Sequence, residues 1–224
     1  MSPENDPLIL DIADLHPHEQ VDPIRLRELK KQLADDGFQK DPIIVEDKNL
    51  IVIDGHHRIR ALRALGYSRV VAHKIDYLED DRIVLKTWYP VITGSRTELI
   101  KALHHCLEAS TQQNGRLQDP VLIINDREYR LRATRRTIMD SLLGRFKIEY
   151  VPDVETAKKL SKDNGYGGAI IFGSISKEDV IRAALSGAVL PPKTTQHIVP
   201  NKPVDWFIPL ERLNNGVQTP ATER

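Results

Sequence analysis

The sequence predicts a mixed α/β (α+β) fold with two domains, and two observations support this. Through residues 8–76, short apolar runs alternate with segments whose apolar residues have helical spacing, in the order βαββαβ. A second series of strand and helix patterns follows a transitional stretch at 80–90. We therefore expect a domain over 1–90, a smaller α/β domain over 91–213 that forms a cleft with it, and a flexible tail over 214–224.

The elements of the first domain follow from local start and stop signals. Residues 8–15 predict a short strand and a turn. Asp22 followed by Pro23 is typical of a helix N-cap with proline at the first helical position, and leucines at helical spacing continue that helix to Gly37. Further strands are expected at 43–45, 50–53 and 70–75.

The most informative stretch, IDGHHR, comes at the end of the strand at 50–53. Asp54-Gly55 predicts a tight turn, because glycine tolerates a positive φ. A helix with an apolar inner face runs from this turn to a stop at Gly66. The sequence therefore predicts a strand, a glycine turn and a helix in direct succession.

The first turn of this helix carries two histidines and an arginine, His56, His57 and Arg58. Backbone N–H groups without helical partners, the positive end of the helix dipole and a guanidinium would converge here, and phosphate suits such a site. Alternatively, these side chains are solvated or paired with nearby carboxylates. Acidic residues are preferred at helix starts, so a basic first turn indicates function.

The second domain is expected to contain both helices and strands. Ser95 and Glu98 form a capping box that begins a helix ending near Leu107. Asn125-Asp126 between two apolar runs predicts a hairpin. The hairpin strands are expected at 120–124 and 129–133, further strands at 147–151 and 168–172, and further helices at 135–143, 154–163 and 177–186.

Composition restricts the function classes. The 224 residues contain 32 Lys and Arg against 32 Asp and Glu, and a net charge of zero argues against a surface that wraps nucleic acid, although a local basic patch is compatible with it. No apolar run approaches the roughly 18 residues that a membrane-spanning helix needs. The N-terminus has no signal-peptide pattern, and the single cysteine, Cys106, permits no internal disulfide, so we expect a cytoplasmic protein without a membrane partner.

The loop LHPHEQVDP contains a candidate general base, Glu19. If the strand order brings this loop beside the turn at Asp54-Gly55, the Glu19 carboxylate would lie close to a bound phosphate. Phosphoryl transfer to a hydroxyl needs this pairing of an anion site with a carboxylate that takes or orients the proton. Alternatively, Glu19 caps the next helix or lies in solvent, which is the commoner role of a glutamate in a loop.

Asp54 is also a candidate ligand for Mg²⁺, which commonly binds one or two carboxylates together with substrate phosphates. The preference of tight turns for aspartate before glycine explains this residue equally well. Zinc has little support, because the histidines lack the spacing of a structural or catalytic zinc site. The P-loop, the dinucleotide-binding glycine pattern and the protein-kinase signatures are also absent from the sequence.

A second set of polar side chains lies in the segment LPPKTTQHIVP near the C-terminus. In an extended backbone, Lys193, Thr195 and His197 point to one face, where they could bind a carboxylate or a phosphate. A polar edge strand is the alternative. Trp88 is one of only two tryptophans, and a tryptophan belongs more often to the core than to a ligand site.

Five short motifs occur in order along the chain. They are LHPHE at 15–19, KDPI at 40–43, DGHHR at 54–58, Thr87-Trp88 and PPKTTQH at 191–197. The block from Leu15 to Tyr77 resembles the ParB/sulfiredoxin superfamily, and the five motifs together, which span most of the chain, are similar to the free serine kinases within it. The catalytic cysteine of sulfiredoxins is replaced by His56, and the DGHHR motif differs from the Gly-Glu-Arg-Arg form usual in ParB proteins.

The resemblance implies phosphorylation of L-serine to O-phospho-L-serine, a step of amino-acid biosynthesis, with ADP or ATP as the phosphoryl donor and Mg²⁺ as cofactor. Glu19 would be the catalytic carboxylate, and Asp54 would lie beside the transferring phosphoryl group and hold the metal. The nucleotide phosphates would bind at Gly55, His56, His57 and Arg58. The serine would bind at Trp88, Lys193, Thr195 and His197.

Two other functions are compatible with the sequence. A ParB-like nucleotide-dependent DNA-binding or regulatory protein would use the basic helix after the turn, which carries Arg58, Arg60 and Arg63. The zero net charge and the lack of an evident helix-turn-helix argue against nucleic acid as a partner. A degenerate relative that binds without turnover is the third function, and the presence of Glu19 and Asp54 argues against it. The sequence predicts no particular oligomeric state.

Overall fold

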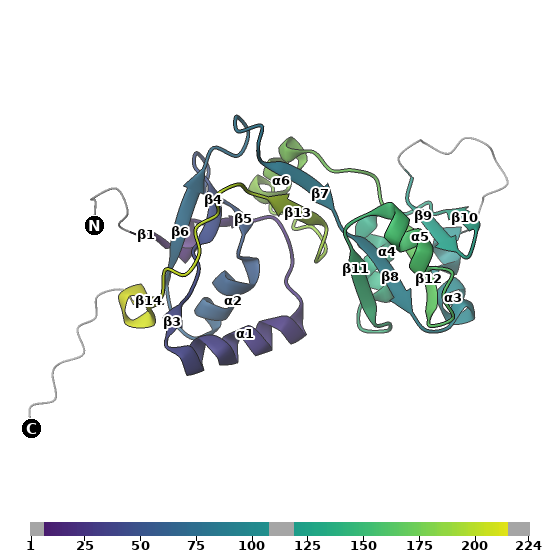
Figure 1. The fold of residues 1–224 in the computed structure, drawn as a ribbon, viewed down its shortest axis with the longest axis horizontal. Coiled ribbons are helices and arrows are strands. Elements are labelled where there is room, and N and C mark those ends of the chain that lie inside the picture. Colours follow the sequence, from purple (N-terminus) through teal and green to yellow (C-terminus); the bar gives the residue numbers. More distant parts are fainter. Residues whose placement is uncertain (1–6, 108–118, 215–224) are drawn as a thin grey trace, which may run out of the picture. The chain divides into compact units, whose positions relative to one another are not determined.

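The chain folds into two units, and neither is continuous in sequence (Figure 1). The computed structural model describes residues 7–107 and 119–214. Within these ranges, the first unit draws on 7–84, 177–192 and 199–214, and the second on 85–107, 119–176 and 193–198. This division differs from the consecutive domains predicted at 1–90 and 91–213, because the second unit is inserted into the first. The predicted tail at 214–224 lies outside the described residues except for Asn214.

The first unit is built on a five-stranded mixed sheet in the order β1-β6-β4-β5-β2. Its strands are β1 (Leu8–Asp11), β2 (His16–Pro17), β4 (Ile43–Glu46), β5 (Ile51–Asp54) and β6 (Arg69–Ile75). The β2/β5 and β4/β6 pairs are parallel, whereas the β1/β6 and β4/β5 pairs are antiparallel. The strands predicted at 43–45, 50–53 and 70–75 are therefore confirmed.

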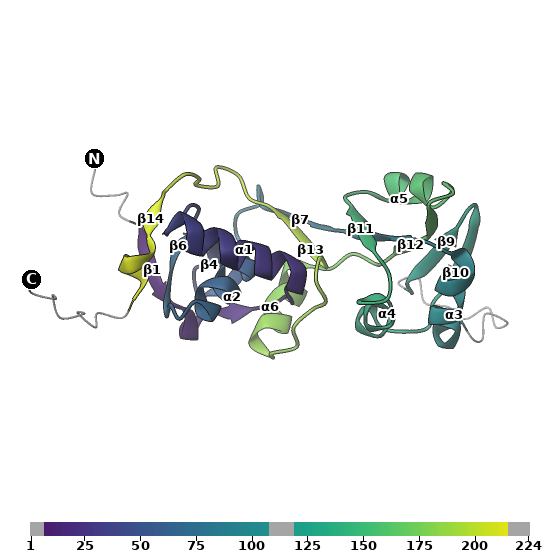
Figure 2. The ribbon, with the colours of Figure 1, turned by 90° about the horizontal axis from the view of Figure 1, so that it is seen from below.

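Two helices of this unit, α1 (Pro23–Asp36) and α2 (His56–Ala64), pack against each other (Figure 2). The Asp22 carboxylate accepts hydrogen bonds from the N–H groups of Ile24 and Arg25 at 2.7 and 3.0 Å, and α1 ends at Gly37 with a φ of 74°. Both predicted end signals of this helix are confirmed. A short 3-10 helix (Ile12–Asp14) connects β1 to β2.

Later segments of the chain return to the first unit and pack on it. The helix α6 (Lys177–Leu185) packs against β2 and β5, and its inner face buries Val180, Ala183 and Ala184. The strand β14 (Ile208–Pro209) pairs with β3 (Phe38–Gln39) and leads into a 3-10 helix (Leu210–Leu213). These contacts join residues that are far apart in sequence, and local sequence patterns alone place both segments in the predicted second domain.

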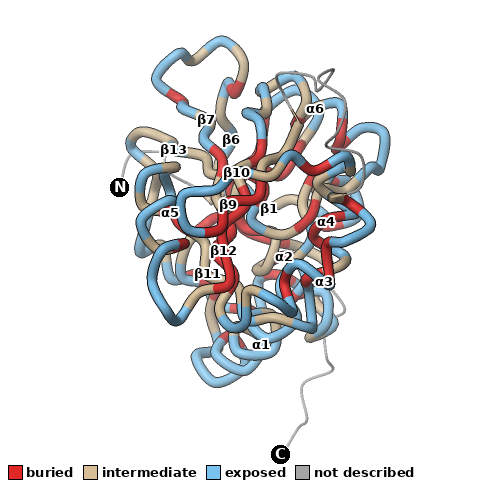
Figure 3. Tube along the Cα trace, turned by 90° about the vertical axis from the view of Figure 1, so that its right-hand side faces the viewer, coloured by how far each residue is buried: buried red, intermediate tan, exposed pale blue. Residues whose placement is uncertain are grey.

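The second unit contains a five-stranded antiparallel sheet in the order β10-β9-β12-β8-β11. Its strands are β8 (Tyr89–Thr93), β9 (Val121–Ile124), β10 (Arg127–Arg130), β11 (Ile148–Val151) and β12 (Tyr166–Ile171), and its helices are α3 (Arg96–Leu107), α4 (Arg135–Leu142) and α5 (Val154–Leu160). Most residues within β9 and β12 are buried (Figure 3). A separate pair joins β7 (Val84–Thr87) to β13 (Thr195–Ile198). None of the helices in the described ranges is long and apolar enough to cross a membrane.

The predicted hairpin around Asn125 is confirmed by β9 and β10, although β10 begins two residues before the strand predicted at 129–133. The predicted transitional stretch at 80–90 contains β7 and the start of β8. Pro90 lies within β8 and faces Tyr150 of β11. The ladder to β12 begins only at Val91, so the missing N–H of the proline does not interrupt that pairing. A proline disfavours a central strand in a sequence, and this placement explains why β8 was missed.

Candidate active site

The predicted tight turn lies at the end of β5, and α2 begins directly after it. Gly55 has a φ of 106°, and a Cβ atom at this position would lie 2.4 Å from Cγ2 of Ile43. Any other residue would therefore be strained and would also collide with β4. The first-turn N–H groups of α2 open at the edge of the sheet where β5 ends, which is the arrangement that binds anions at helix N-termini.

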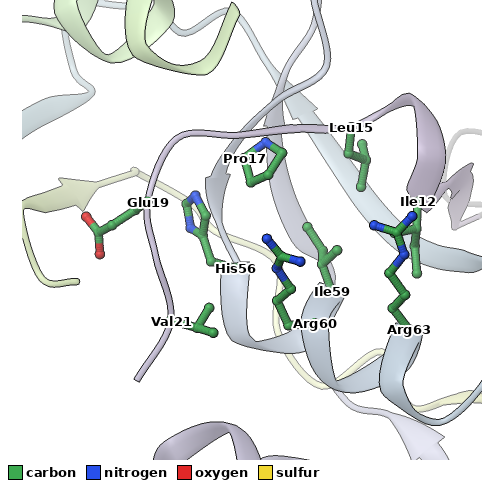
Figure 4. A pocket seen from close by; sticks show the side chains of 9 residues that line it. All are labelled: Ile12, Leu15, Pro17, Glu19, Val21, His56, Ile59, Arg60 and Arg63. Carbon is green, nitrogen blue, oxygen red and sulfur yellow. The ribbon is translucent and has the colours of Figure 1, made fainter. Parts of the chain in front are cut away.

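The loop that carries Glu19 leaves the same sheet beside this turn. Because β2 and β5 are parallel, both strands carry the chain toward the same edge of the sheet. Glu19 and His56 line one small cavity of about 50 Å³, in which they lie at one end and Arg63 lies at the other (Figure 4). The condition for a catalytic role of Glu19, a loop beside the turn, is thus met, and the role itself stays a prediction.

Two histidines of α2 hold the Glu19 loop in place. The backbone N–H of His18 donates to Nε2 of His56 at 3.3 Å, and the backbone N–H of Asp22 donates to Nε2 of His57 at 3.0 Å. Along the chain, these bonds lie on either side of Glu19. Nε2 is the acceptor in both bonds, because the donor in each is a backbone N–H group. His56 and His57 therefore use their Nε2 atoms to position the loop, and their predicted contact with phosphate stays a prediction.

Further contacts fix the loop around His18, which is fully buried. Its Nδ1–H donates to the Val52 carbonyl at 2.7 Å, and its ring packs edge-on against His56 with the ring centroids 4.5 Å apart. On the other side, the N–H of Leu190 donates to the His18 carbonyl at 2.7 Å, and Glu19 and Leu190 form a parallel bridge. Glu19 is thus held between α2 and the chain that follows α6.

Asp54 brings a carboxylate to the turn, where two cations compensate it. Its Oδ2 contacts Nζ of Lys202 and lies 3.7 Å from Nη2 of Arg58. Burial acts to raise the pKa of Asp54, but the Arg58 charge and the contact with Lys202 outweigh it and hold this pKa below its ordinary value. Lys202 was missed by the sequence reading, because it lies 148 residues from Asp54 in a segment without a recognisable motif.

Backbone carbonyl groups fix the Arg58 side chain. Its Nη1 donates to the carbonyl of Asp41 at 2.9 Å and to the carbonyl of Pro42. The buried side-chain amide of Gln39 donates to the same Asp41 carbonyl at 2.8 Å and to the Val71 carbonyl at 2.9 Å. The KDPI motif therefore orients the guanidinium through main-chain atoms.

The sequence is similar to curated kinases along nearly its whole length. No protein-family model matches it. Over 232 residues it is 32% identical to the ATP-dependent L-serine kinase of Staphylothermus marinus, and the match covers 93% of this chain and 91% of that protein. This chain belongs to the L-serine kinase family. It is also 27% identical over 240 residues to another member, the ADP-dependent L-serine kinase SerK of Thermococcus kodakarensis, with 93% of each chain covered.

The fold of this L-serine kinase family member matches that of a solved free serine kinase. The structure of that enzyme in complex with AMP is 22% identical in sequence and superimposes with a TM-score of 0.79, covering 93% of each chain. The resemblance inferred from the five motifs is confirmed by the relatives, and the mixed α/β fold class is confirmed by the structure.

The four residues assigned to serine belong to the second unit. Nζ of Lys193 lies 5.4 Å from the ring centroid of Trp88, which is half-buried. Lys193 has a φ of 58°, so the extended alternation predicted to align it with Thr195 and His197 begins only at Thr195. Thr195 is buried and His197 is half-buried. Their contact with serine stays a prediction.

The buried imidazole of His18 makes the stability of this family member depend on pH. Burial lowers its pKa from 6.5 to about 4, against the opposing effect of the hydrogen bond to Val52. Between these pH values, the unfolded chain binds a proton that the folded state excludes. The free energy of unfolding is therefore unaffected by the titration of His18 above pH 6.5 and decreases as the pH falls toward 4, by an amount approaching about 3 kcal/mol.

A His18→Asn variant should have a flatter dependence of stability on pH in this range. Asparagine keeps an N–H donor for the Val52 carbonyl but does not titrate. The measurement is urea unfolding from pH 6.5 to about 4 for the wild type, His18→Asn and His16→Asn, where His16 is an exposed histidine of the neighbouring strand β2. His16→Asn should keep the wild-type slope, and an unchanged slope in His18→Asn would contradict the assignment.

Proposed function

We propose that this chain is a free L-serine kinase that transfers a phosphoryl group from ADP or ATP to the serine hydroxyl and gives O-phospho-L-serine. The proposal rests mainly on the position of the Glu19 loop, which His56 and His57 hold by hydrogen bonds beside the glycine turn at the start of α2. A carboxylate next to an anion site is what phosphoryl transfer to a hydroxyl requires. Membership of the family supports serine as the acceptor.

Glu19 is the general base of the proposed reaction. The serine hydroxyl is a weak nucleophile, so its oxygen bonds to phosphorus as its proton passes to the Glu19 carboxylate. The phosphoanhydride bond of the donor breaks, and its electron pair stays on the leaving phosphate oxygen. ATP thus gives ADP, and ADP gives AMP. The hydrogen bonds on either side of Glu19 supply the positioning that proton transfer needs.

The donor phosphates bind at the turn and at the first turn of α2, from Gly55 to Arg58. The helix dipole and the N–H groups of this segment attract the anion, and the absence of a side chain on Gly55 preserves the turn. Because the rings of His56 and His57 hold the Glu19 loop through Nε2, these two residues serve the phosphates through their backbone. Arg58 adds positive charge from a fixed position.

Asp54 is the proposed protein ligand of Mg²⁺. In the part of the chain that the structure describes, no three His, Cys, Asp or Glu side chains are grouped so that they could hold a metal alone. One ionised carboxylate, with 41% of its side chain exposed, suits a Mg²⁺ ion bound jointly by the protein and the nucleotide phosphates. When bound, Mg²⁺ would neutralise charge on the phosphoryl oxygens.

The proposed acceptor site consists of four residues of the second unit, Trp88, Lys193, Thr195 and His197. The Lys193 ammonium group, which lies over the Trp88 ring, suits the serine carboxylate. The hydroxyl of Thr195 and the imidazole of His197 come from the same strand, β13, and can form hydrogen bonds with the α-amino and carboxylate groups of serine.

The direct test is incubation of the protein with L-serine, Mg²⁺ and either ADP or ATP. We expect phosphoserine in an amount equal to the AMP or ADP formed, measured by mass spectrometry and phosphorus NMR. Without serine, the nucleotide should not be consumed. Nucleotide turnover independent of serine would contradict the proposal, and salt-sensitive retention of DNA in a gel shift without phosphoserine formation would favour the ParB-like alternative.

A further inference from the structure

Lys202 is a second cation at the turn, and the mechanism above gives it no role. It belongs to the C-terminal part of the first unit, and its Nζ contacts Oδ2 of Asp54. The Lys202 side chain is 35% exposed and that of Asp54 is 41% exposed. The pair is therefore open to a ligand that arrives at the edge of the sheet where α2 begins.

The segment around Lys202 is anchored independently of Asp54. The N–H of Trp206 donates to the Lys40 carbonyl at 2.8 Å, and the N–H of Asp205 donates to Oδ1 of Asp41 at 2.9 Å. The Asp205 carboxylate also lies 3.2 Å from Nζ of Lys40. The backbone at Lys202 thus stays beside the turn when its side chain changes partner.

Arg58 and Lys202 differ in their freedom to reach a new anion. The Arg58 side chain is 18% exposed, and its Nη1 is bound to the carbonyls of Asp41 and Pro42. Lys202 is a flexible ammonium group whose side-chain contact in the structure is with Asp54. If Lys202 left, Asp54 would keep Arg58 as a partner at 3.7 Å.

We propose that Lys202 is a phosphate-binding residue for the nucleotide donor, an inference that rests on the proposed function. When the nucleotide binds, Nζ moves from Asp54 to a donor phosphate oxygen, where three N–H donors and a full charge suit the anion. The move also releases one Asp54 oxygen for the Mg²⁺ that accompanies the nucleotide. Until the nucleotide binds, Lys202 thus neutralises the Asp54 carboxylate in place of Mg²⁺.

The test measures binding of adenosine, AMP and ADP to the full chain by calorimetry in the presence of a chelator. Lys202→Met should weaken ADP binding by about tenfold or more, the size expected for one lost charge-assisted hydrogen bond, and leave adenosine binding within about twofold. Lys202→Arg should recover most of the ADP affinity. Lys31→Met, at an exposed lysine of α1, is the matched control and should behave as the wild type.

A purely structural role for Lys202 predicts a different pattern. If the lysine only neutralises Asp54, then the Lys202→Met change should have no effect on ADP affinity in an Asp54→Asn background, whereas the proposal predicts that the double variant still binds ADP about tenfold more weakly than Asp54→Asn alone. Equal ADP affinity of the double variant and Asp54→Asn, or an unchanged ADP affinity in Lys202→Met, would overturn it. Because binding is measured without turnover, this result is separate from the phosphoserine assay, and either proposal can fail alone.

Discussion

Glu19→Gln is expected to slow phosphoserine formation by about a hundredfold to ten-thousandfold, the range that a general base contributes. Glutamine has nearly the shape of glutamate but does not accept the serine proton at neutral pH. The hydrogen bonds that hold the loop use the backbone N–H groups of His18 and Asp22, so they survive the change. The variant should therefore bind ADP within about twofold of the wild type.

The measurement is steady-state turnover with serine, paired with calorimetric binding of ADP. Glu79→Gln is a suitable control, because Glu79 is exposed and lies outside the site. A Glu19→Gln variant with wild-type turnover would remove this carboxylate from the chemistry. Lost ADP binding would instead mean that the substitution had displaced the loop from the turn.

Elements with signals at both ends were predictable from sequence. The helix α1 has its cap at Asp22 and its stop at Gly37, and α2 lies between two glycines with positive φ, Gly55 and Gly66. In each case, the deciding contacts join residues within one or two turns of the chain. Such signals are complete in a short window of sequence and do not depend on the rest of the fold.

Elements decided by distant contacts were not predictable in this way. β8 holds a central position in its sheet although it contains Pro90, because the β12 ladder starts one residue later. The return of α6 and β14 to the first unit depends on packing against β5 and pairing with β3. Local sequence patterns do not identify such distant partners, so the sequence predicted one domain boundary, between residues 90 and 91.

The candidate site shows the same division. The strand, turn and first helical turn at Asp54-Gly55 could be placed from sequence, whereas the position of Glu19 depended on the β2/β5 pairing. His56 and His57 were predicted as phosphate-binding residues of the first helical turn, and the bonds that their Nε2 atoms accept from the Glu19 loop could not be predicted. The types of residue at the turn indicated an active site, whereas the contacts between individual side-chain and backbone atoms became known only from the fold.

Gly55→Ala is expected to lower the free energy of unfolding by about 4 kcal/mol, as the sum of two costs. The first is backbone strain, because alanine disfavours a φ of 106°. The second is a collision, because the new Cβ would lie 2.4 Å from Cγ2 and 2.8 Å from Cβ of Ile43, which is fully buried. Relief of the collision must move the start of α2, so ADP binding should weaken as well.

Gly66→Ala separates the two costs, because Gly66 lies just beyond the other end of α2 with a φ of 91° and no atom within 4 Å of its would-be Cβ. That variant bears only the backbone strain, about 1–2 kcal/mol, and should bind ADP normally. Urea unfolding of both variants with the wild type gives the comparison. Equal losses of stability in the two variants would mean that β4 shifts to make room for the new methyl group at little cost. The close packing of Ile43 would then not explain the glycine at position 55.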